Sequence, residues 1–205
     1  GSALLLKLHQ EGFSVAITVR SKSDLFDENV RQLVVGDLTN EIDWLPVLEN
    51  INCVIHLAGK AHNKKIEDEV GADEFHIINT RQTLLLAGCS VAAGVNRFIF
   101  LSSIGVNGSS NVTPFTEEDL PNPIGGYAQS KYKAELGLLN IARESNMEVV
   151  IIRPPLVYGA NAPGNFGRLL KWAACKFPIP LPLGAIKNSR SFLFIDNLVD
   201  FIFLC

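Results

Sequence analysis

Five short and almost continuously apolar runs set the strongest limit on the fold of this chain. Strands that alternate apolar and polar residues keep one face in water, whereas continuous apolar runs are typical of strands buried on both faces of a parallel sheet. The runs cover residues 13–19, 32–37, 52–57, 97–102 and 148–153. This pattern predicts an α/β protein.

Segments with helical spacing separate the apolar runs, and parallel strands require such crossover connections. Residues 3–11 have this spacing and end at Gly12, a residue suited to the position just after a helix. Further helices are predicted over residues 42–48, 66–93 and 126–145. After Pro154 prolines become frequent, and one more helix is expected near residues 165–176. Alternating strands and helices predict a Rossmann-like, doubly wound parallel sheet.

A Tyr-x-x-x-Lys step is the strongest chemical signal in the sequence. Tyr127 and Lys131 lie four residues apart in a predicted helix, so they share one face. A neighbouring ammonium favours the ionised phenol and should lower the pKa of Tyr127 from its ordinary value of about 10. Ser103 follows the run 97–102 and can hydrogen-bond the same substrate oxygen. The alternative is an amphipathic helix with a half-buried tyrosine and a solvated lysine.

Composition argues against several other classes of protein. The chain has 205 residues, 47% of them hydrophobic, which suffices for one core. Its net charge of −3, without a concentrated basic stripe, argues against nucleic acid as a partner. The four cysteines form no C-x-x-C pair and read as reduced thiols of a cytoplasmic protein. No apolar stretch approaches the roughly 20 residues that span a bilayer. Neither a membrane partner nor a metal site is expected.

Seven short motifs together resemble the extended short-chain dehydrogenase/reductase family, in the branch of NAD-dependent epimerases and dehydratases that act on nucleotide sugars. No single motif is decisive, but all seven occur in the family's order along the whole chain. They are Asp37-Leu38, His56-Leu57-Ala58-Gly59, Asn79, Leu101-Ser102-Ser103, Tyr127-x-x-x-Lys131, Arg153 to Gly159, and Arg190 to Asp196. The resemblance implies that Ser103, Tyr127 and Lys131 are the catalytic residues.

The resemblance also implies a dinucleotide cofactor, either NAD or NADP. Arg20 stands where NAD-preferring relatives commonly carry an acidic residue, so NADP is one option, whereas the nearby Asp24 leaves NAD open. The rival interpretations are a basic surface loop for Arg20, a turn residue for Asp37, and close helix packing for Ala58-Gly59. The implied cofactor-binding residues are Gly1, Arg20, Asp37, Leu38, Leu57, Ala58, Gly59, Tyr127, Lys131, Pro154 and Leu156.

For the substrate, the resemblance implies contacts from Ser103, Asn165 and Arg190. A guanidinium can bind a diphosphate through two parallel hydrogen bonds, although Arg190 also fits an ordinary surface loop. The expected division of the chain is a dinucleotide-binding Rossmann-like domain over residues 1–153 and a partial substrate-binding region over residues 154–205.

The sequence departs from the family at its start. The family's glycine-rich fingerprint follows a first strand, which is lacking here, and Gly1-Ser2-Ala3-Leu4 fits either the last glycine of that fingerprint or a cloning remnant. The missing strand belongs at the centre of the sheet, so unpaired backbone groups, a groove in the core and poor cofactor binding are expected. We therefore expect an N-terminally truncated sheet and a C-terminal substrate lobe that is also incomplete.

The residues after Ser103 restrict the reaction. Dehydratases of the family carry an Asp-Glu pair there, whereas this chain has Ile104-Gly105. The expected reaction is hydride transfer at C4 of a UDP-linked sugar, because the motifs resemble UDP-sugar 4-epimerases and the UDP-N-acetylquinovosamine-forming 4-keto reductases of surface-polysaccharide synthesis. A truncated, non-catalytic dinucleotide-binding or scaffold protein is the alternative. Relatives often form homodimers through two long helices, which here would be residues 66–93 and 126–145.

Overall fold

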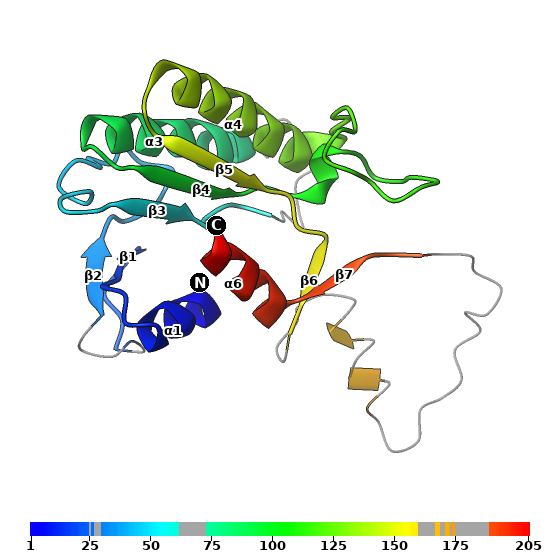
Figure 1. Cartoon of the computed structure of the whole chain (residues 1–205), viewed down its shortest axis with the longest axis horizontal. Helices are drawn as coiled ribbons and strands as arrows, with labels where there is room; N and C mark the ends of the chain where they lie inside the picture. Colours follow the sequence, from blue (N-terminus) through cyan, green and yellow to red (C-terminus); the bar gives the residue numbers. More distant parts are fainter. Residues whose placement is uncertain are drawn as a thin grey trace.

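The computed structural model describes residues 1–24, 26, 30–61, 73–159, 167–168, 171–172, 174 and 189–205. From β3 to β5, helices separate successive strands, whereas β1, β2 and β3 follow one another without a described helix between them (Figure 1). The strands are β1 (Ala16–Val19), β2 (Arg31–Val34), β3 (Cys53–His56), β4 (Arg97–Leu101), β5 (Glu148–Ile152), β6 (Leu156–Tyr158) and β7 (Phe192–Phe194). The helices are α1 (Ser2–Gln10), η1 (His76–Arg81), α3 (Gln82–Ala92), η2 (Ile104–Val106), α4 (Gly125–Glu144) and α6 (Ile195–Leu204).

The centre of the molecule is a parallel sheet in the order β3, β4, β5. Successive side chains of the middle strand point to opposite faces, as the pleat requires. Phe98 and Phe100 enter one hydrophobic cluster, whereas Ile99 enters the other. Both clusters are closed to water, so β4 is buried on both faces, as its continuous apolar run predicts.

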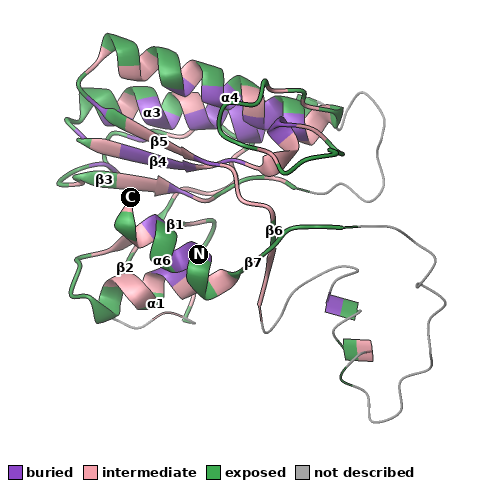
Figure 2. Cartoon of the chain, turned by 45° about the vertical axis from the view of Figure 1, so that its right-hand side comes forward, coloured by how far each residue is buried: buried purple, intermediate pink, exposed green. Residues whose placement is uncertain are grey.

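Helices cover both faces of this sheet. On one face, α3 and α4 supply Leu86, Ala134 and Leu138 to the cluster that holds the two phenylalanines. On the other face, α1 and α6 supply Leu4 and Leu198. Figures 1 and 2 show the two helix layers on opposite sides of the strands, with buried residues gathered between them. The predicted Rossmann-like, doubly wound α/β fold is confirmed.

The described strands form three separate sheets, of which β1–β2 and β6–β7 are the two smaller ones. Both smaller sheets are also parallel. The β1–β2 pair lies on the β3 side of the central sheet, and no described ladder joins β1 to β3 (Figure 1). This break is where the sequence analysis placed the lacking central strand. Because α6 packs under the central sheet, residues 195–204 share its core, and the domain division at residue 153 stays a prediction.

Most predicted elements form close to their expected positions, but the helix over residues 42–48 is wrong. Residues 45–50 form turns instead. The Asp43 carboxylate accepts a hydrogen bond from the Leu45 backbone N–H at 3.2 Å, and Pro46 lacks an N–H for helix propagation. Trp44 and Leu48 are nevertheless buried, so the apolar spacing correctly indicated the buried face.

The long helix predicted over residues 66–93 is irregular where it is described. It passes through the π-helical turn η1 before continuing as α3, whereas residues 66–72 lie outside the described residues. Most of the helix predicted over residues 165–176 also lies outside them. Single π-helical turns are frequent at functional sites, and Asn79, buried within η1, therefore becomes a residue of interest.

The end of α1 shows how local sequence fixes a boundary. Gly12 has φ of +80°, and the N–H groups of Gly12 and Phe13 donate to the carbonyls of His9 and Leu8. This is the Schellman pattern, in which a left-handed residue closes the helix. The helix end predicted from Gly12 is confirmed.

Two helical glycines should respond oppositely to alanine. At Gly137 on α4, a Cβ would lie 2.5 Å from a methyl group of Leu84 on α3. Overpacking there should lower the free energy of unfolding by about 1–2 kcal/mol. At Gly88 a Cβ meets nothing within 4 Å, so Gly88→Ala should raise it by about 0.5–1 kcal/mol. Urea unfolding of both variants tests this. Equal stabilisation by the two alanines would show that α3 and α4 do not cross this closely.

Candidate active site

The predicted site residues follow the carboxyl ends of parallel strands, where ligands bind in open α/β sheets. Arg20 follows β1, Asp37 follows β2, Gly59 follows β3 and Ser103 follows β4. Tyr127 and Lys131 reach this edge from the first turns of α4. The sheet therefore brings together residues that are far apart in sequence, as expected.

Tyr127 is half-buried beside Ser103. Its ring meets that of Phe75 edge-on, with ring centroids 6.2 Å apart. Burial raises the pKa of Tyr127 above its ordinary value, and a hydrogen bond with the Ser103 side chain opposes this rise. The expected lowering of the Tyr127 pKa by Lys131 is therefore wrong in this structure. The physical reason is the direction in which the ammonium points.

The ammonium of Lys131 is buried, with only 3% of the residue exposed. Its Nζ donates to the Leu101 carbonyl at 2.9 Å and lies 4.5 Å from the centroid of the Phe100 ring. Burial lowers the pKa of Lys131 to about 8, against the opposing charge of Glu135. The group is still mostly cationic at neutral pH. The alternative of a solvated lysine is wrong.

Ser103 caps the short helix η2 that follows β4. Its Oγ accepts a hydrogen bond from the Gly105 N–H at 3.1 Å, and its backbone is extended. A hydroxyl can accept this bond and still donate its proton. Ser103 is therefore held in place while it remains able to donate to Tyr127 or to a substrate oxygen. Ile104 and Gly105 provide no carboxylate at this turn.

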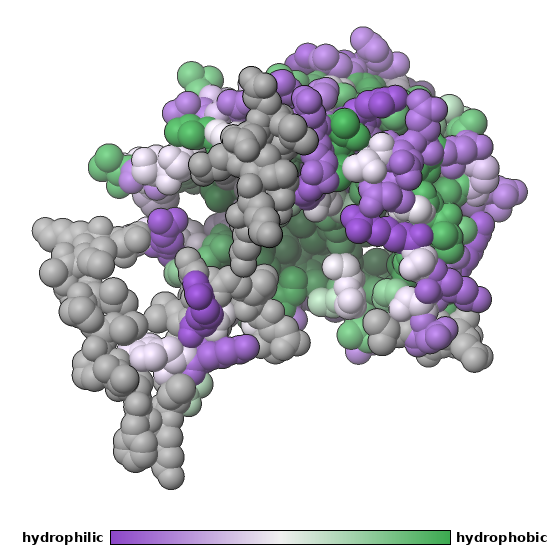
Figure 3. All heavy atoms as spheres, turned by 180° about the vertical axis from the view of Figure 1, so that it is seen from behind, coloured by the Kyte–Doolittle hydropathy of each residue, from purple (hydrophilic) through white to green (hydrophobic). Residues whose placement is uncertain are grey.

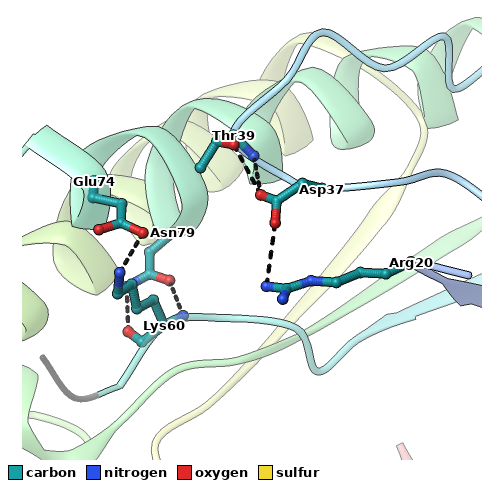
Figure 4. A network of polar contacts seen from close by, with 6 residues as sticks. All are labelled: Arg20, Asp37, Thr39, Lys60, Glu74 and Asn79. Atoms are coloured by element: carbon teal, nitrogen blue, oxygen red, sulfur yellow. Dashed lines mark hydrogen bonds and ion pairs between the residues drawn. The ribbon is translucent and has the colours of Figure 1, made fainter.

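Asn79 connects the loop after β3 to the helix that carries Tyr127 and Lys131. Its Oδ1 accepts from the Lys60 N–H at 2.8 Å, and its Nδ2 donates to the Lys60 carbonyl and the Ser130 Oγ, each at 3.0 Å. Figure 4 shows Asn79 against the Lys60 backbone, with the Lys60 ammonium paired to Glu74. Asn79 is one of the seven motifs of the resemblance, but it was not among the predicted site residues.

Arg20 and Asp37 lie face to face at the ends of β1 and β2. The Arg20 guanidinium is 3.6 Å from the Asp37 carboxylate, which also accepts from the Thr39 N–H and hydroxyl at 2.9 Å each (Figure 4). These bonds from Thr39, and more weakly Arg20, lower the pKa of Asp37. Asp37 is thus the turn residue of its rival interpretation, and its second oxygen faces Arg20. Leu38 packs against the core beside it.

The remaining predicted residues are less closely joined. Gly1 precedes α1, Leu57 packs against the sheet core, and Ala58 is exposed. The Pro154 carbonyl accepts from the Ile104 N–H at 3.0 Å, which holds the segment after β5 beside the Ser103 turn. Leu156 opens β6, and Arg190 lies exposed two residues before β7. Asn165 lies outside the described residues.

The backbone at Gly59 fits the approach of a ligand. A Cβ there would lie 3.1 Å from both the Lys131 Nζ and the Asn79 Oδ1. A side chain would therefore crowd the buried cation, whereas glycine leaves the backbone accessible. Figure 3 shows hydrophobic side chains gathered in a recessed area of the face seen from behind. These features fit a dinucleotide that passes Gly59 and ends beside Tyr127 and Lys131.

The described part of the chain offers neither a metal-binding cluster nor a membrane-spanning helix. Its His, Cys, Asp and Glu side chains form no group of three or more that could hold a metal ion. None of its helices combines the length and apolar character needed to cross a membrane.

Comparison with known proteins agrees with this geometry. The NAD dependent epimerase/dehydratase family matches residues 1–205. The chain is 41% identical over 174 residues to the UDP-glucose 4-epimerase of Vibrio cholerae, covering 83% of this chain and 52% of that protein. The structure of MoeE5 in complex with UDP-glucose and NAD matches with a TM-score of 0.80 and 26% identity, covering 100% of this chain and 67% of that one.

A third comparison supports the fold alone. The UDP-glucose 4-epimerase of Thermotoga maritima, solved with UDP-glucose, matches with a TM-score of 0.79 at 24% identity, covering 98% of this chain and 67% of that one. The chain belongs to the NAD dependent epimerase/dehydratase family, and the resemblance drawn from its motifs is confirmed. It spans about half the length of the curated relatives it matches.

His56, which is not among the predicted catalytic residues, is a core residue. It is 6% exposed, its ring stacks on that of Phe100 at 5.9 Å, and its Nε2 lies 3.0 Å from the Thr83 Oγ1. Burial, assisted by the charge of Lys131, lowers the pKa of His56 to about 3 from 6.5. The ring is therefore neutral in the folded protein at all but strongly acidic pH.

Protonation of His56 should weaken the fold in acid. Between about pH 3 and 6.5 the unfolded chain binds a proton that the folded chain does not, so stability rises with pH across this window. Each unit of the shift corresponds to about 1.4 kcal/mol, so several kcal/mol are at stake. In His56→Gln the free energy of unfolding should depend less on pH across this window, as measured by urea unfolding. His9→Gln, at an exposed position of α1, should keep the wild-type slope. An unchanged slope in His56→Gln would contradict the assignment.

Proposed function

We propose that this chain carries the cofactor-binding and proton-transfer residues of an enzyme that transfers hydride at C4 of a nucleotide sugar. The observation that carries the proposal is the contact between the hydroxyls of Ser103 and Tyr127, with the buried cation of Lys131 one helical turn away and against Gly59. Such a group can move a hydroxyl proton beside a bound nicotinamide. The family membership supports the same activity.

Each side chain has a distinct part in the proposed chemistry. When bound, the nicotinamide supplies reversible hydride transfer. Tyr127 takes the proton of the sugar hydroxyl during oxidation and returns it during reduction. Ser103 donates a hydrogen bond to the same oxygen and stabilises the charge that develops there. Lys131 supplies a fixed positive charge beside Gly59, which stabilises the negative charge that develops on the reacting oxygen.

We propose NAD as the cofactor. The family is described as NAD dependent, and the MoeE5 structure was solved with NAD. Arg20, the residue that left NADP open, faces the Asp37 carboxylate, which offsets its charge toward a 2′-phosphate. Arg20, Asp37, Leu38, Leu57, Ala58 and Gly59 remain the proposed residues for the adenosine and phosphate part, and Pro154 and Leu156 for the nicotinamide end.

We favour the epimerase over the 4-keto reductase. The Vibrio cholerae relative is a UDP-glucose 4-epimerase, which also supports a UDP-linked substrate. Arg190 is the proposed diphosphate contact, because it is exposed and its guanidinium can form two parallel bonds. The role in surface-polysaccharide synthesis, the cytoplasmic location and the homodimer stay predictions.

Replacement of the proposed base tests the chemistry. Tyr127→Phe should lower turnover by about 10²–10⁴-fold, because the proton then has no acceptor of suitable geometry. Conversion of UDP-glucose is measured with and without added NAD, alongside the circular dichroism of each variant. Tyr132→Phe, on the same helix, is the matched control and should keep its turnover.

The outcomes of this assay separate the candidate functions. Full activity in Tyr127→Phe would refute the assignment of Tyr127 as the base. Turnover without added cofactor supports the epimerase, whereas a strict requirement for added NADH or NADPH supports the reductase. Cofactor binding without turnover on any UDP-sugar would support the non-catalytic alternative.

Cofactor preference is tested by fluorescence titration. NADH should bind more tightly than NADPH, because the Asp37 carboxylate repels a 2′-phosphate. In Asp37→Asn this preference should shrink by about tenfold, since the site then lacks the repelling carboxylate and Arg20 is free of its partner. Tighter binding of NADPH by the unaltered chain would overturn the assignment of NAD.

A further inference from the structure

An ion pair between the buried Glu135 and the partly buried Arg153 lies one turn beyond Lys131 on α4. The Arg153 guanidinium donates to both oxygens of the Glu135 carboxylate, with its Nε at 3.0 and 3.2 Å and its Nη2 at 2.6 Å. Glu135 is 1% exposed. This two-pronged geometry is the strongest arrangement that an arginine and a carboxylate can adopt. The pair therefore joins the end of β5 rigidly to the middle of α4.

Arg153 has a third attachment, to the turn that follows Ser103. Its Nη1 donates to the Asn107 Oδ1 at 3.1 Å, and Asn107 closes η2. Backbone bonds support the same junction, because the Ile104 N–H donates to the Pro154 carbonyl at 3.0 Å. One guanidinium thus connects the three elements that carry or flank Ser103, Tyr127 and Lys131.

Helical spacing places Glu135 on the same face as the proposed catalytic pair. Residues 127, 131 and 135 are four apart, so their side chains follow one another along α4. The Glu135 charge raises the pKa of Lys131, against the lowering by burial. The Arg153 guanidinium supplies the opposite charge that the buried Glu135 carboxylate needs, because a buried charge without a partner is costly.

In the described part of the chain, few titratable groups surround Glu135 and Lys131. Lys131 and Tyr132 come from α4, Arg153 directly follows β5, and His56 from β3 faces Lys131 as a neutral ring. The contact from η2 is the uncharged Asn107. Glu135 is thus the carboxylate that acts on the Lys131 ammonium. A buried ion pair is weak evidence for stability, since apolar residues often replace it without loss, so its place beside the site points to a role there.

We propose that Glu135, held by Arg153, is a positioning residue that keeps the Lys131 cation and the Ser103 turn in register for proton transfer. This inference rests on the proposed function of Ser103, Tyr127 and Lys131. It adds a residue that acts on the site through Lys131 and Arg153.

The test is a direct titration of Lys131, which needs no turnover. In protein labelled with ¹³C at the lysine Cε, the Lys131 signal is assigned by its loss in Lys131→Arg, and its midpoint is followed by NMR. Glu135→Gln should move the midpoint down from about 8 by about one pH unit, because the neutral amide no longer supports the ammonium. The double variant Glu135→Gln/Arg153→Met, which leaves no unpaired guanidinium, should move it in the same direction if the single variant folds poorly.

Two further variants serve as controls. Glu148→Gln on β5 breaks the exposed ion pair with Arg97 on β4 and should leave the Lys131 midpoint unchanged. Arg153→Lys keeps a cation beside Glu135 and should retain most of the wild-type midpoint, although its point charge cannot make the two-pronged contact. In the active protein, the fall in turnover at alkaline pH should begin about one pH unit lower in Glu135→Gln than in wild type.

An unchanged Lys131 midpoint in folded Glu135→Gln or in the double variant would overturn the role of Glu135. It would leave the proposed function untouched, because that depends on the loss of turnover in Tyr127→Phe. A lowered midpoint in a protein whose turnover does not depend on Tyr127 would instead support the electrostatic role of Glu135 and refute the proposed base.

Discussion

The buried ammonium of Lys131 depends on contacts from three separate parts of the fold. A cation removed from water is costly unless its donors and charge find partners. Here a carbonyl and a ring from β4 meet it directly, and the Glu135 carboxylate from α4 favours its charged form. Gly59 allows the loop after β3 to approach it closely. A change in any of these elements would alter the surroundings of the Lys131 ammonium. The geometry of the site therefore depends on the packing of the core around it.

That order comes from the central sheet. Since β4 is buried on both faces, neither of its neighbours can slip by one residue without exchanging the two apolar clusters. The strand ends are thereby fixed, and with them the positions of Leu101, Ser103 and Pro154. The α3 and α4 layer is fixed in turn, because Gly137 lets Leu84 pack against the backbone of α4. This packing in turn fixes the positions of Tyr127 and Lys131.

Sequence patterns were most reliable where one physical effect dominated. Continuous apolar runs predicted the three central strands because burial on both faces leaves no other composition. The four-residue spacing of Tyr127 and Lys131 predicted their shared face. It did not predict the direction of the ammonium, because that depends on Leu101, Phe100 and Gly59, which no local pattern places together. The helix predicted over residues 42–48 failed for a related reason, since the side chain of Asp43 and the ring of Pro46 outweigh a correct apolar spacing.

The two ends of the proposed cofactor site are held by different numbers of hydrogen bonds and core contacts. The nicotinamide end rests on the central sheet and on a guanidinium with three attachments. The adenosine end rests on β1 and β2, whose ladder is separate from β3 in the described structure. That ladder is tied to the rest through Leu38, Val35 and Ile42 in the core and through the Gln82 side chain, which donates to the Asn40 carbonyl at 2.6 Å. Fewer hydrogen-bonded neighbours mean a lower free energy of local opening. A cofactor that contacted both parts would therefore meet fewer supporting hydrogen bonds at its adenosine end than at its nicotinamide end.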